Sequence, residues 1–268
     1  MNDAAVILPV VLQSETVLDE FVSNLKSFRH DRLSRVYILC NRLSLMSPDD
    51  LRRRLEESCG VSPEVVHDKE RSVAGAWNRG IELATADGLS TFLITSVDVR
   101  VRDQAIDRLL AFEEARPDVA LWSGSADRGP VPKDELDDAC DFSCFMLRSR
   151  TIETHGWFDR EFTPAYYEDN DYVTRVVLGG GTPKKLLHAK HDHAVSLTIR
   201  ADLDAARHVR LRFPHNKERF LQKWGAKTDS YSELRERCYS SPFQSGRILS
   251  WWPEQDREGY SPSGGIDE

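Results

Sequence analysis

Acidic side chains gather directly after an aromatic run within residues 157–171. Glu168, Asp169 and Asp171 surround Asn170, and apolar residues then recur at helical spacing until three glycines end the pattern. The acids therefore occupy the first turn of a predicted amphipathic helix, where the helix dipole favours negative charge. Apolar neighbours would exclude water from one carboxylate and raise its pKa, as a general base requires. An acidic start to an ordinary surface helix is the alternative interpretation.

Three histidines and an aspartate lie within the six residues 188–193, which read HAKHDH. Imidazole and carboxylate groups suit Mn²⁺ or another transition metal. In an extended segment, His191 and His193 point the same way and Asp192 points the opposite way. The composition fits a metal site and a solvated polar loop equally well.

Another carboxylate, Asp98, follows the apolar run of residues 92–94 and stands between Val97 and Val99. The run predicts a buried strand, which places Asp98 at its carboxyl end. In open α/β sheets, ligands bind outside the carboxyl ends of the strands. A single aspartate at a strand end is more often a turn or cap residue, so a structural role is the competing interpretation.

The first hundred residues show a pattern of alternating strands and helices, which predicts the sheet that positions the candidate site residues. Strands are expected at residues 4–11, 36–39 and 64–67, with one helix after the cap residue Ser14 and another at 47–60. This order implies an α/β fold with an open, mostly parallel twisted sheet and right-handed crossovers. Residues just after each strand are expected to line a ligand site.

The rest of the chain continues the α/β pattern, with a polar loop at residues 124–138 of a length that suits a lid or a binding loop. A helix at 70–84 contains Gly75 and Gly80, and glycines in a helix indicate close approach of backbone or ligand. The other expected elements are strands at 92–94, 119–123, 142–147 and, as an edge strand, 184–189, and helices at 103–115, 149–155, 201–212 and 215–224. Pro214 is expected to break the last two helices apart. Their basic side chains suit either phosphate binding or a solvated surface.

Composition narrows the class of protein. The 268 residues suffice for one large α/β domain or two small ones, and a net charge of −8 argues against a broadly cationic nucleic-acid binder. No apolar run approaches the length of a membrane span, and the start lacks the charged region of a secretory signal. The five cysteines are an odd, scattered set, which indicates reduced thiols in a cytoplasmic protein.

Four segments, in this order and at these separations, resemble an inverting family 2 glycosyltransferase with the GT-A fold. They are VILPV at 6–10, ERSVAGAWNRGIELA at 70–84, FLITSVDV at 92–99, and the stretch 155–181 with HAKHDHAVS at 188–196. The resemblance spans roughly residues 6–198. It implies a GT-A domain over 1–200, with a nucleotide-sugar half at about 1–100 and an acceptor half at about 101–200. A helical C-terminal extension at 201–245 and a loosely ordered tail at 246–268 would follow.

The resemblance implies transfer of a sugar from a UDP-, GDP- or dTDP-linked donor to an acceptor hydroxyl with inversion. Asp98 with His191 or His193 would hold Mn²⁺ or Mg²⁺ on the diphosphate, and Asp169 or Glu168 would take the acceptor proton. Nucleotide or phosphate contacts are expected from Pro9, Val10, Asn41, Gly75, Asn78, Arg79 and Ser96, and stacking on sugar or acceptor from Trp157, Tyr166 and Tyr167.

The chain departs from the family pattern at two places. Cys40 stands where an aspartate is expected at the end of the second strand, followed by Asn41, and the metal motif keeps only Asp98 after Ser96 and Val97. A degenerate binding module without catalysis is therefore an alternative. A nucleotidyltransferase-like enzyme is another, although the glycine-rich basic signature that it needs near the first strand is lacking. The sequence leaves the acceptor open among a glycan, a protein, a small molecule and a modified nucleic-acid base, and it leaves the oligomeric state open.

Overall fold

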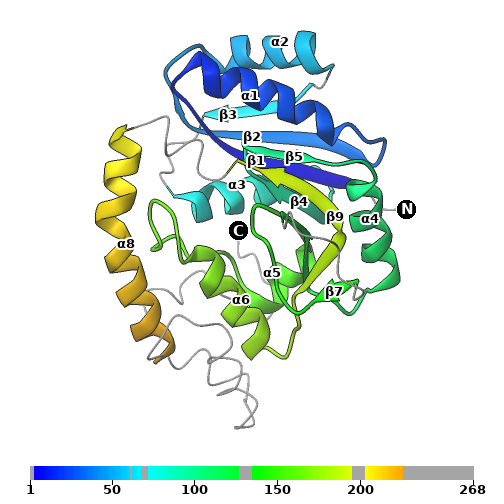
Figure 1. Ribbon diagram of the computed structural model, residues 1–268, viewed down its shortest axis with the longest axis vertical. Coiled ribbons are helices and arrows are strands. Elements are labelled where there is room, and N and C mark those ends of the chain that lie inside the picture. The colour runs from blue at the N-terminus through cyan, green and yellow to red at the C-terminus, as the bar shows by residue number, and fades with distance from the viewer. Residues whose placement is uncertain (1–2, 61, 68–71, 127–134, 195–202, 226–268) are drawn as a thin grey trace.

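The computed structural model describes residues 3–60, 62–67, 72–126, 135–194 and 203–225 (Figure 1). The first half contains β1 (Ala4–Leu12), α1 (Glu15–Leu25), a 3-10 turn (Lys26–Phe28), β2 (Leu33–Leu43), α2 (Pro48–Cys59), β3 (Glu64–His67), α3 (Val73–Ala86), β4 (Thr91–Thr95) and β5 (Val99–Val101). The second half contains α4 (Ala105–Ala115), β6 (Leu121–Ser125), β7 (Leu136–Asp137), β8 (Cys144–Arg148), α5 (Ser149–His155), α6 (Glu168–Leu178), β9 (Lys184–His193) and α8 (Leu203–Trp224). The predicted α/β class is confirmed.

The strands pair in the order β3-β2-β1-β4-β8-β6-β9-β5, and β7 pairs with β9. The four strands β3, β2, β1 and β4 are parallel, as the βαβαβ pattern predicts. Strand β8 runs antiparallel to β4, with Cys144 opposite Thr95. The start of β8 therefore lies beside the carboxyl end of β4, where a ligand site is expected.

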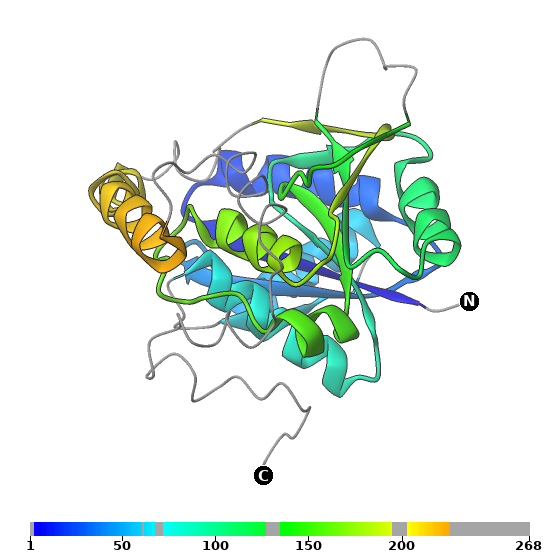
Figure 2. The same ribbon diagram turned by 90° about the horizontal axis from the view of Figure 1, so that it is seen from below.

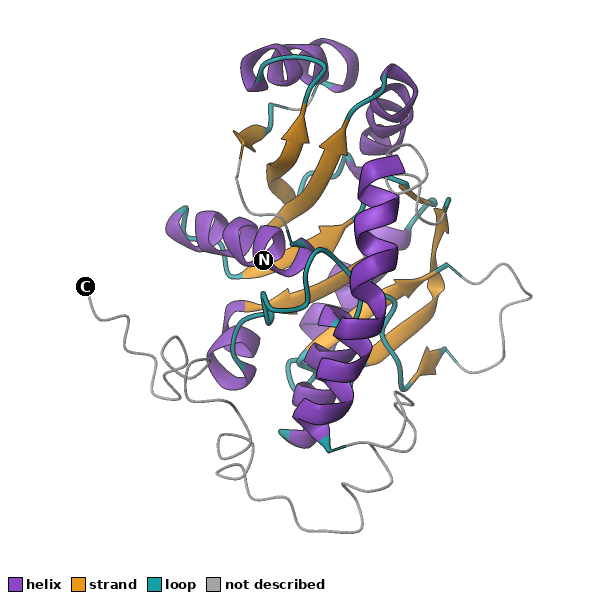
Figure 3. Ribbon diagram, turned by 90° about the vertical axis from the view of Figure 1, so that its left-hand side faces the viewer, coloured by secondary structure: helices purple, strands orange, loops and turns teal. Residues whose placement is uncertain are grey.

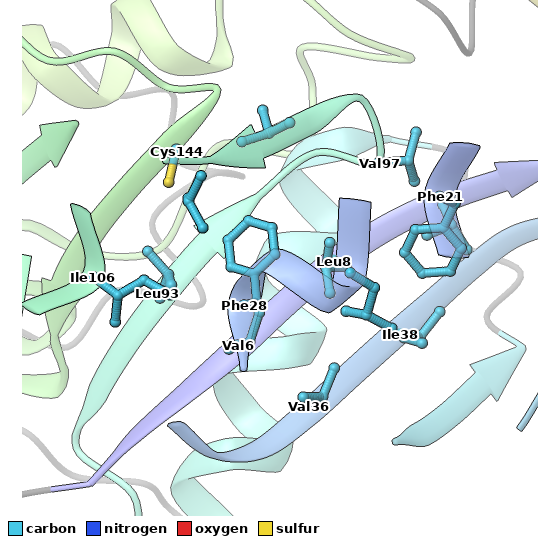
Figure 4. Packing of buried hydrophobic residues seen from close by; sticks show 14 of the residues in the cluster. Val6, Leu8, Phe21, Phe28, Val36, Ile38, Leu93, Val97, Ile106 and Cys144 are labelled. Carbon is cyan, nitrogen blue, oxygen red and sulfur yellow. The ribbon is translucent and has the colours of Figure 1, made fainter. Parts of the chain in front are cut away.

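Strand β1 is buried on both faces because helices cover each side of it. Its side chains alternate between two apolar cores, with Val6 and Leu8 in one and Ala5 and Ile7 in the other. The first core packs against α1 and its following turn, and Figure 4 shows Phe28 among its members. The second core packs against α3, and Figures 1 and 2 show α1 and α3 on opposite sides of this strand.

Gly80 brings helix α3 close to the sheet. A Cβ atom at this position would lie 2.3 Å from Ile7 Cγ2 and 3.2 Å from Leu39 Cδ2. The expected close approach at Gly80 is therefore an approach of helix backbone to sheet side chains. Gly80 sets the depth at which α3 packs, and with it the width of the second core.

Strand β9 differs from the predicted edge strand at 184–189. It continues to His193 and lies between β6 and β5 in the sheet. The histidine-rich segment is thus part of a strand, because β5, which the sequence patterns do not indicate, supplies partners for its last three residues. Pairing with β5 fixes His191 and His193 far more firmly than a polar loop would.

The predicted break at Pro214 is wrong, because α8 is one helix with Pro214 inside it. Proline removes one backbone hydrogen bond and costs about 3 kcal/mol in a helix. Packing on both sides of it offsets that cost: the Phe213 ring lies 5.3 Å from the Tyr167 ring, and Phe220 is buried. Figure 3 shows α8 as the long helix in front of the other elements.

Some expectations fall outside the described residues. These are the first two residues of the helix expected at 70–84, the middle of the polar loop at 127–134, residues 195–202 between the histidine-rich segment and the expected helix at 201–212, and the tail and end of the extension at 226–268. Within the described part of the chain, no helix combines the length and apolar character that crossing a membrane requires. The four cysteines described, Cys40, Cys59, Cys140 and Cys144, are free thiols.

Candidate functional site

The turn after β4 holds Asp98 in a fixed position. Asn24 Nδ2 donates to Val97 O at 3.0 Å, and Ser96 Oγ donates to Asp98 Oδ1 at 2.6 Å. Val97 and Val99 are buried on either side, and Asp98 itself is only 5% exposed. The carboxylate is thus presented from a rigid strand end, with Ser96 beside it as expected.

His193 is the histidine that contacts the Asp98 carboxylate. Its Nε2 lies 3.4 Å from Asp98 Oδ1, because β9 pairs with β5 directly after Asp98 and sets His193 opposite Val99. The hydrogen bond to Asp98 raises the pKa of His193. The His193 side chain keeps about a quarter of its surface exposed. It therefore offers a nitrogen beside Asp98 that a ligand can still reach.

His191 lies on the same side of β9 but is almost fully buried. Its Nε2 lies 2.8 Å from Ser143 Oγ, and burial lowers its pKa. Its Nδ1 is buried without a hydrogen-bond partner, and Gly124 packs over it so closely that a Cβ there would lie 2.9 Å away. Asp192 points the other way and pairs with Arg102 at 2.6 Å, so the predicted alternation is confirmed.

Asp141 is a site residue that the sequence patterns do not single out. Its Oδ1 accepts from Ser143 Oγ at 2.5 Å, and its Oδ2 lies 3.6 Å from His191 Nε2. The charge of Asp141 also acts on His193. Asp141 precedes β8, and only the antiparallel pairing of β8 with β4 brings it to this edge. A prediction from the sequence that β8 runs antiparallel to β4 would have placed Asp141 at this edge.

The acid pair lies at the start of α6, as predicted. Glu168 is 6% exposed and its Oε2 has no hydrogen-bond partner, whereas Asp169 is half-buried. Burial raises the pKa of Glu168 well above its usual value, and the neighbouring charge of Asp169 adds to the shift. Burial also raises the pKa of Asp169. Two adjacent acids with raised pKa values suit proton transfer, with Asp169 the more accessible one.

The thiol of Cys140 is affected by the charges of acids from both groups. Burial raises the pKa of its thiol, and the charges of both Asp141 and Asp169 add to that shift. The thiol therefore lies within electrostatic range of the acid next to His191 and of the acid at the start of α6. Asp98, the two histidines and Asp141 thus lie together at one end of the sheet.

The expected nucleotide residues of β1 and β2 divide between two faces of the sheet. Val10 is buried in the first core, as is Cys40, whose pKa is raised to about 12 by burial. Pro9 and Asn41 follow the alternation onto the face that α3 covers further along, and both are only partly buried. Asn41 lies where the pairing of β1 with β2 shifts register, and its Oδ1 is buried without a partner. This oxygen is an acceptor that an N–H group of a ligand would satisfy.

Three residues of α3 that are expected to contact the nucleotide have partners within the protein. The N–H of Gly75 is capped by Ser72 Oγ at 3.0 Å. Asn78 is buried and exchanges two hydrogen bonds with the backbone of Phe158, at 2.8 and 3.0 Å. Arg79 is exposed and pairs with Glu82. The Asn78 amide is thus engaged by the backbone of Phe158, and Arg79 is paired with Glu82.

The three aromatic residues that are expected to stack on sugar or acceptor differ in how far they are buried. Trp157 packs against the second core and its carbonyl accepts from Arg175 at 2.5 Å. Tyr167 is buried against α8, which leaves it no free face for an acceptor. Tyr166 is 37% exposed beside the acid pair, with Phe213 of α8 in edge-to-face contact at 5.5 Å. Of the three aromatic residues, Tyr166 is the most exposed, Trp157 is partly buried and Tyr167 is buried.

Asp98 and His193 provide too few side chains to hold a divalent cation alone, and a bound phosphate would have to complete its coordination. No group of three metal-ligating side chains occurs among the residues that the structure describes. Asp98 and His193 supply one carboxylate and one accessible imidazole. Mg²⁺ and similar ions are often held by one or two side chains plus substrate phosphates. His191 does not fit, because its Nε2 is taken by Ser143 and its Nδ1 is covered.

Comparison with known proteins places the fold. No family model matches the sequence, and no curated protein matches it either. Among solved structures, the mannosyltransferase PcManGT from Pyrobaculum calidifontis, in complex with GDP-Man and Mn²⁺, has a TM-score of 0.58 at 15% identity, over 95% of this chain and 81% of that one. GalNAc-T7 with UDP, GalNAc and Mn²⁺ has a TM-score of 0.58 at 11% identity, over 97% of this chain and 59% of that one.

The TarS structure from S. aureus has a TM-score of 0.54 at 13% identity, and the match covers 95% of this chain. This chain spans half the length of TarS. All three neighbours are glycosyltransferases of the GT-A type, and the chain has that fold. At these identities the likeness establishes the fold and not the substrate.

Proposed function

We propose that this protein is an inverting glycosyltransferase of the family 2 type, which uses a nucleoside diphosphate sugar and a divalent cation. The observation that carries the proposal is the contact of Asp98 with His193 at the carboxyl end of β4. It unites two segments that are distant in the sequence at the edge where open α/β sheets bind ligands. Asp141 lies beside His191 at this edge, and the charges of Asp141 and Asp169 both act on the Cys140 thiol, which supports a shared site.

Asp169 is the proposed general base, and Glu168 is the proposed neutral partner. Asp169 is half-buried and reachable, whereas Glu168 is enclosed, and burial raises the pKa of Glu168 well above its usual value. In the proposed step Asp169 takes the proton of an acceptor hydroxyl. The hydroxyl oxygen forms a bond to the anomeric carbon, and the bond from that carbon to the diphosphate breaks on the opposite face. The nucleoside diphosphate leaves with the bonding electrons, which inverts the anomeric centre.

Asn41 is the proposed contact to the nucleotide base, with Pro9 beside it on the same face. Its unpartnered Oδ1 is a hydrogen-bond acceptor, and uracil, thymine and guanine each carry a ring N–H that suits it. This assigns to Asn41 the place that an aspartate holds in the family, with Cys40 left in the core. Mn²⁺ or Mg²⁺ bound by Asp98 and His193 would neutralise charge that develops on the leaving diphosphate.

Purified protein incubated with GDP-mannose or UDP-N-acetylgalactosamine tests this function. These donors correspond to the ligands in the structures of the two neighbours. We expect Mn²⁺-dependent release of GDP or UDP, with water as acceptor, and a rise in melting temperature with the matching nucleotide. Thermal stabilisation without any release of nucleotide would instead support a binding module, which the absence of a three-ligand group among the described residues favours as the alternative.

A further inference from the structure

Two consecutive tyrosines with left-handed backbone conformations precede the acid pair. The φ angle is +74° at Tyr166 and +77° at Tyr167. Residues with a Cβ atom rarely adopt this region, and such conformations persist only where surrounding contacts enforce them. Tyr167 is also the N-cap of α6, and it makes no side-chain capping hydrogen bond. The direction in which Glu168 and Asp169 leave the loop thus depends on contacts from outside it.

Asn216 of α8 supplies such contacts. Its side chain is 1% exposed, and its Nδ2 lies 3.0 Å from Ala165 O and 3.1 Å from Tyr166 O. Thr163 O lies 3.4 Å from the same nitrogen. One buried amide therefore faces three carbonyl oxygens of the turn that ends two residues before the acid pair. The amide carries two N–H groups, which suffice for Ala165 O and Tyr166 O, while Thr163 O also lies 3.5 Å from Arg212 Nε.

Other contacts fix α8 against the start of α6, so that Asn216 does not move independently of the acids. Trp224 Nε1 donates to Asp171 Oδ1 at 3.0 Å, and Lys223 Nζ lies 3.0 Å from the same oxygen. The Tyr167 ring packs 5.6 Å from the Phe220 ring. Figure 1 shows α8 alongside the loop that leads into α6.

We propose that Asn216 is a positioning residue for the general base, and that the C-terminal helix α8 is therefore part of the catalytic centre. The Asn216 amide holds the carbonyls of Thr163, Ala165 and Tyr166, and through them the left-handed turn that aims Asp169 at the acceptor. Asn216 itself touches no reacting atom. This inference rests on the proposed function of Asp169.

The chemistry of the amide distinguishes two substitutions. Asn216→Ala removes the donor and leaves Ala165 O and Tyr166 O, in a partly buried place, without it. Asn216→Asp keeps the shape, but an ionised carboxylate would direct negative charge at those oxygens. A protonated carboxyl group carries one donor hydrogen and partly replaces the amide. The Asp variant is therefore expected to recover as the pH is lowered.

The test compares Asn216→Ala and Asn216→Asp with Gln222→Ala, which truncates an exposed amide on the same helix. The substrate is GDP-mannose or UDP-N-acetylgalactosamine, whichever the wild type uses. The readouts are kcat for Mn²⁺-dependent release of nucleotide, the pH profile of kcat, and the Kd for that donor. We expect Asn216→Ala to lower kcat on the order of 100-fold, as misplacement of a reacting group does, with the donor Kd near the wild-type value. We expect the activity of Asn216→Asp relative to wild type to rise as the pH falls. Gln222→Ala should match the wild type.

Melting curves at each pH give the folded fraction and separate positioning from folding. A loss of kcat that matches the loss of folded protein, or an Asn216→Asp profile parallel to that of the wild type, would overturn the inference. If Asn216→Ala does not fold, Asn216→Ser, which keeps one donor, takes its place with the same expected split between kcat and Kd. An Asp169→Asn variant that keeps full activity overturns the proposed function itself. An inactive Asp169→Asn variant beside a fully active Asn216→Ala overturns only the role of Asn216.

Discussion

His193 Nε2 and Asp98 Oδ1 lie 3.4 Å apart, although 94 residues separate them in the chain. The pairing of β5 with β9 creates this contact, and neither residue would reach the other without it. The contact turns a single carboxylate at a strand end into a pair of potential metal ligands. It is the feature from which the proposed metal and donor site follows.

Replacing either member of this pair should weaken metal-dependent donor binding. We expect Asp98→Asn and His193→Ala to reduce the Mn²⁺-dependent affinity for UDP or GDP on the order of 10–100-fold, the range seen when metal sites are disturbed. Isothermal titration with and without Mn²⁺ measures the effect.

His188→Ala is the matched control for these variants, because His188 is exposed on the same strand. It should leave binding unchanged. Equal affinities for wild type and His193→Ala in the presence of Mn²⁺ would show that His193 is not a ligand.

Glu168 should make the folded protein less stable as the pH rises. Burial raises the pKa of Glu168 in the folded state, so the folded state binds more protons than the unfolded state above the usual glutamate pKa. The stability that this group contributes is present below that value and is lost as the pH rises towards the folded-state pKa. We expect Glu168→Gln to reduce the fall in melting temperature between about pH 5 and pH 8.

Glu82→Gln is the control for the pH series, because about 40% of the Glu82 side chain is exposed and its charge is shared with Arg79 and Arg160. It should keep the wild-type slope. A Glu168→Gln variant with the same slope as the wild type would contradict the raised pKa.

The charged cluster that joins α6 to α8 should be costly to break. Asp171 is fully buried and faces both Arg175 and Lys223, each almost fully buried. Removing one member of a buried ion pair typically costs 3–5 kcal/mol, because the remaining charge stays buried. We therefore expect Asp171→Ala to lower the free energy of unfolding by about 3–5 kcal/mol, measured by urea denaturation.

Arg102→Ala is the matched control for that substitution. Arg102 pairs with Asp192 at 2.6 Å, but both side chains are about half exposed. Exposed pairs contribute roughly 0–1 kcal/mol, so this variant should stay close to the wild type. Similar losses in Asp171→Ala and Arg102→Ala would mean that α8 is not anchored through Asp171.

Gly80→Ala should destabilise the protein although alanine is the better helix former. Its Cβ would lie 2.3 Å from Ile7 Cγ2, and overpacking of a core usually costs about 1–3 kcal/mol. Chemical denaturation gives the change. The double variant with Ile7→Ala should lose less than the sum of the two single losses, since the second substitution makes room for the first. Strict additivity would contradict the close contact.

Much of the fold follows from local patterns in the sequence. Ser14, Ser47 and Ser72 each cap a helix, and the first two caps are predicted from the sequence. The parallel half of the sheet follows from apolar runs separated by helices. The single helix α8 does not follow, because the cost of Pro214 is local whereas the packing of Phe213 and Phe220 that offsets it is tertiary.

The candidate site is predicted only in part for the same reason. Asp98, His193 and the acid pair stand out by residue type and position. Asp141 and Asn216 do not, because the first depends on the antiparallel direction of β8 and the second on where α8 docks. The hydrogen bonds of the Asn78 amide to the backbone of Phe158 do not follow from the sequence either, because they depend on where the segment before α6 packs against α3.

Comparison of nucleotide release with donor binding in Asp169→Asn tests the central claim most directly. The substitution keeps the size of the side chain and removes its ability to accept a proton from the acceptor. We predict that Mn²⁺-dependent release of GDP or UDP falls on the order of 100-fold or more, while the Kd for the sugar donor, measured by isothermal titration, stays near the wild-type value. Wild-type release by Asp169→Asn, or donor binding lost together with release, would contradict the account.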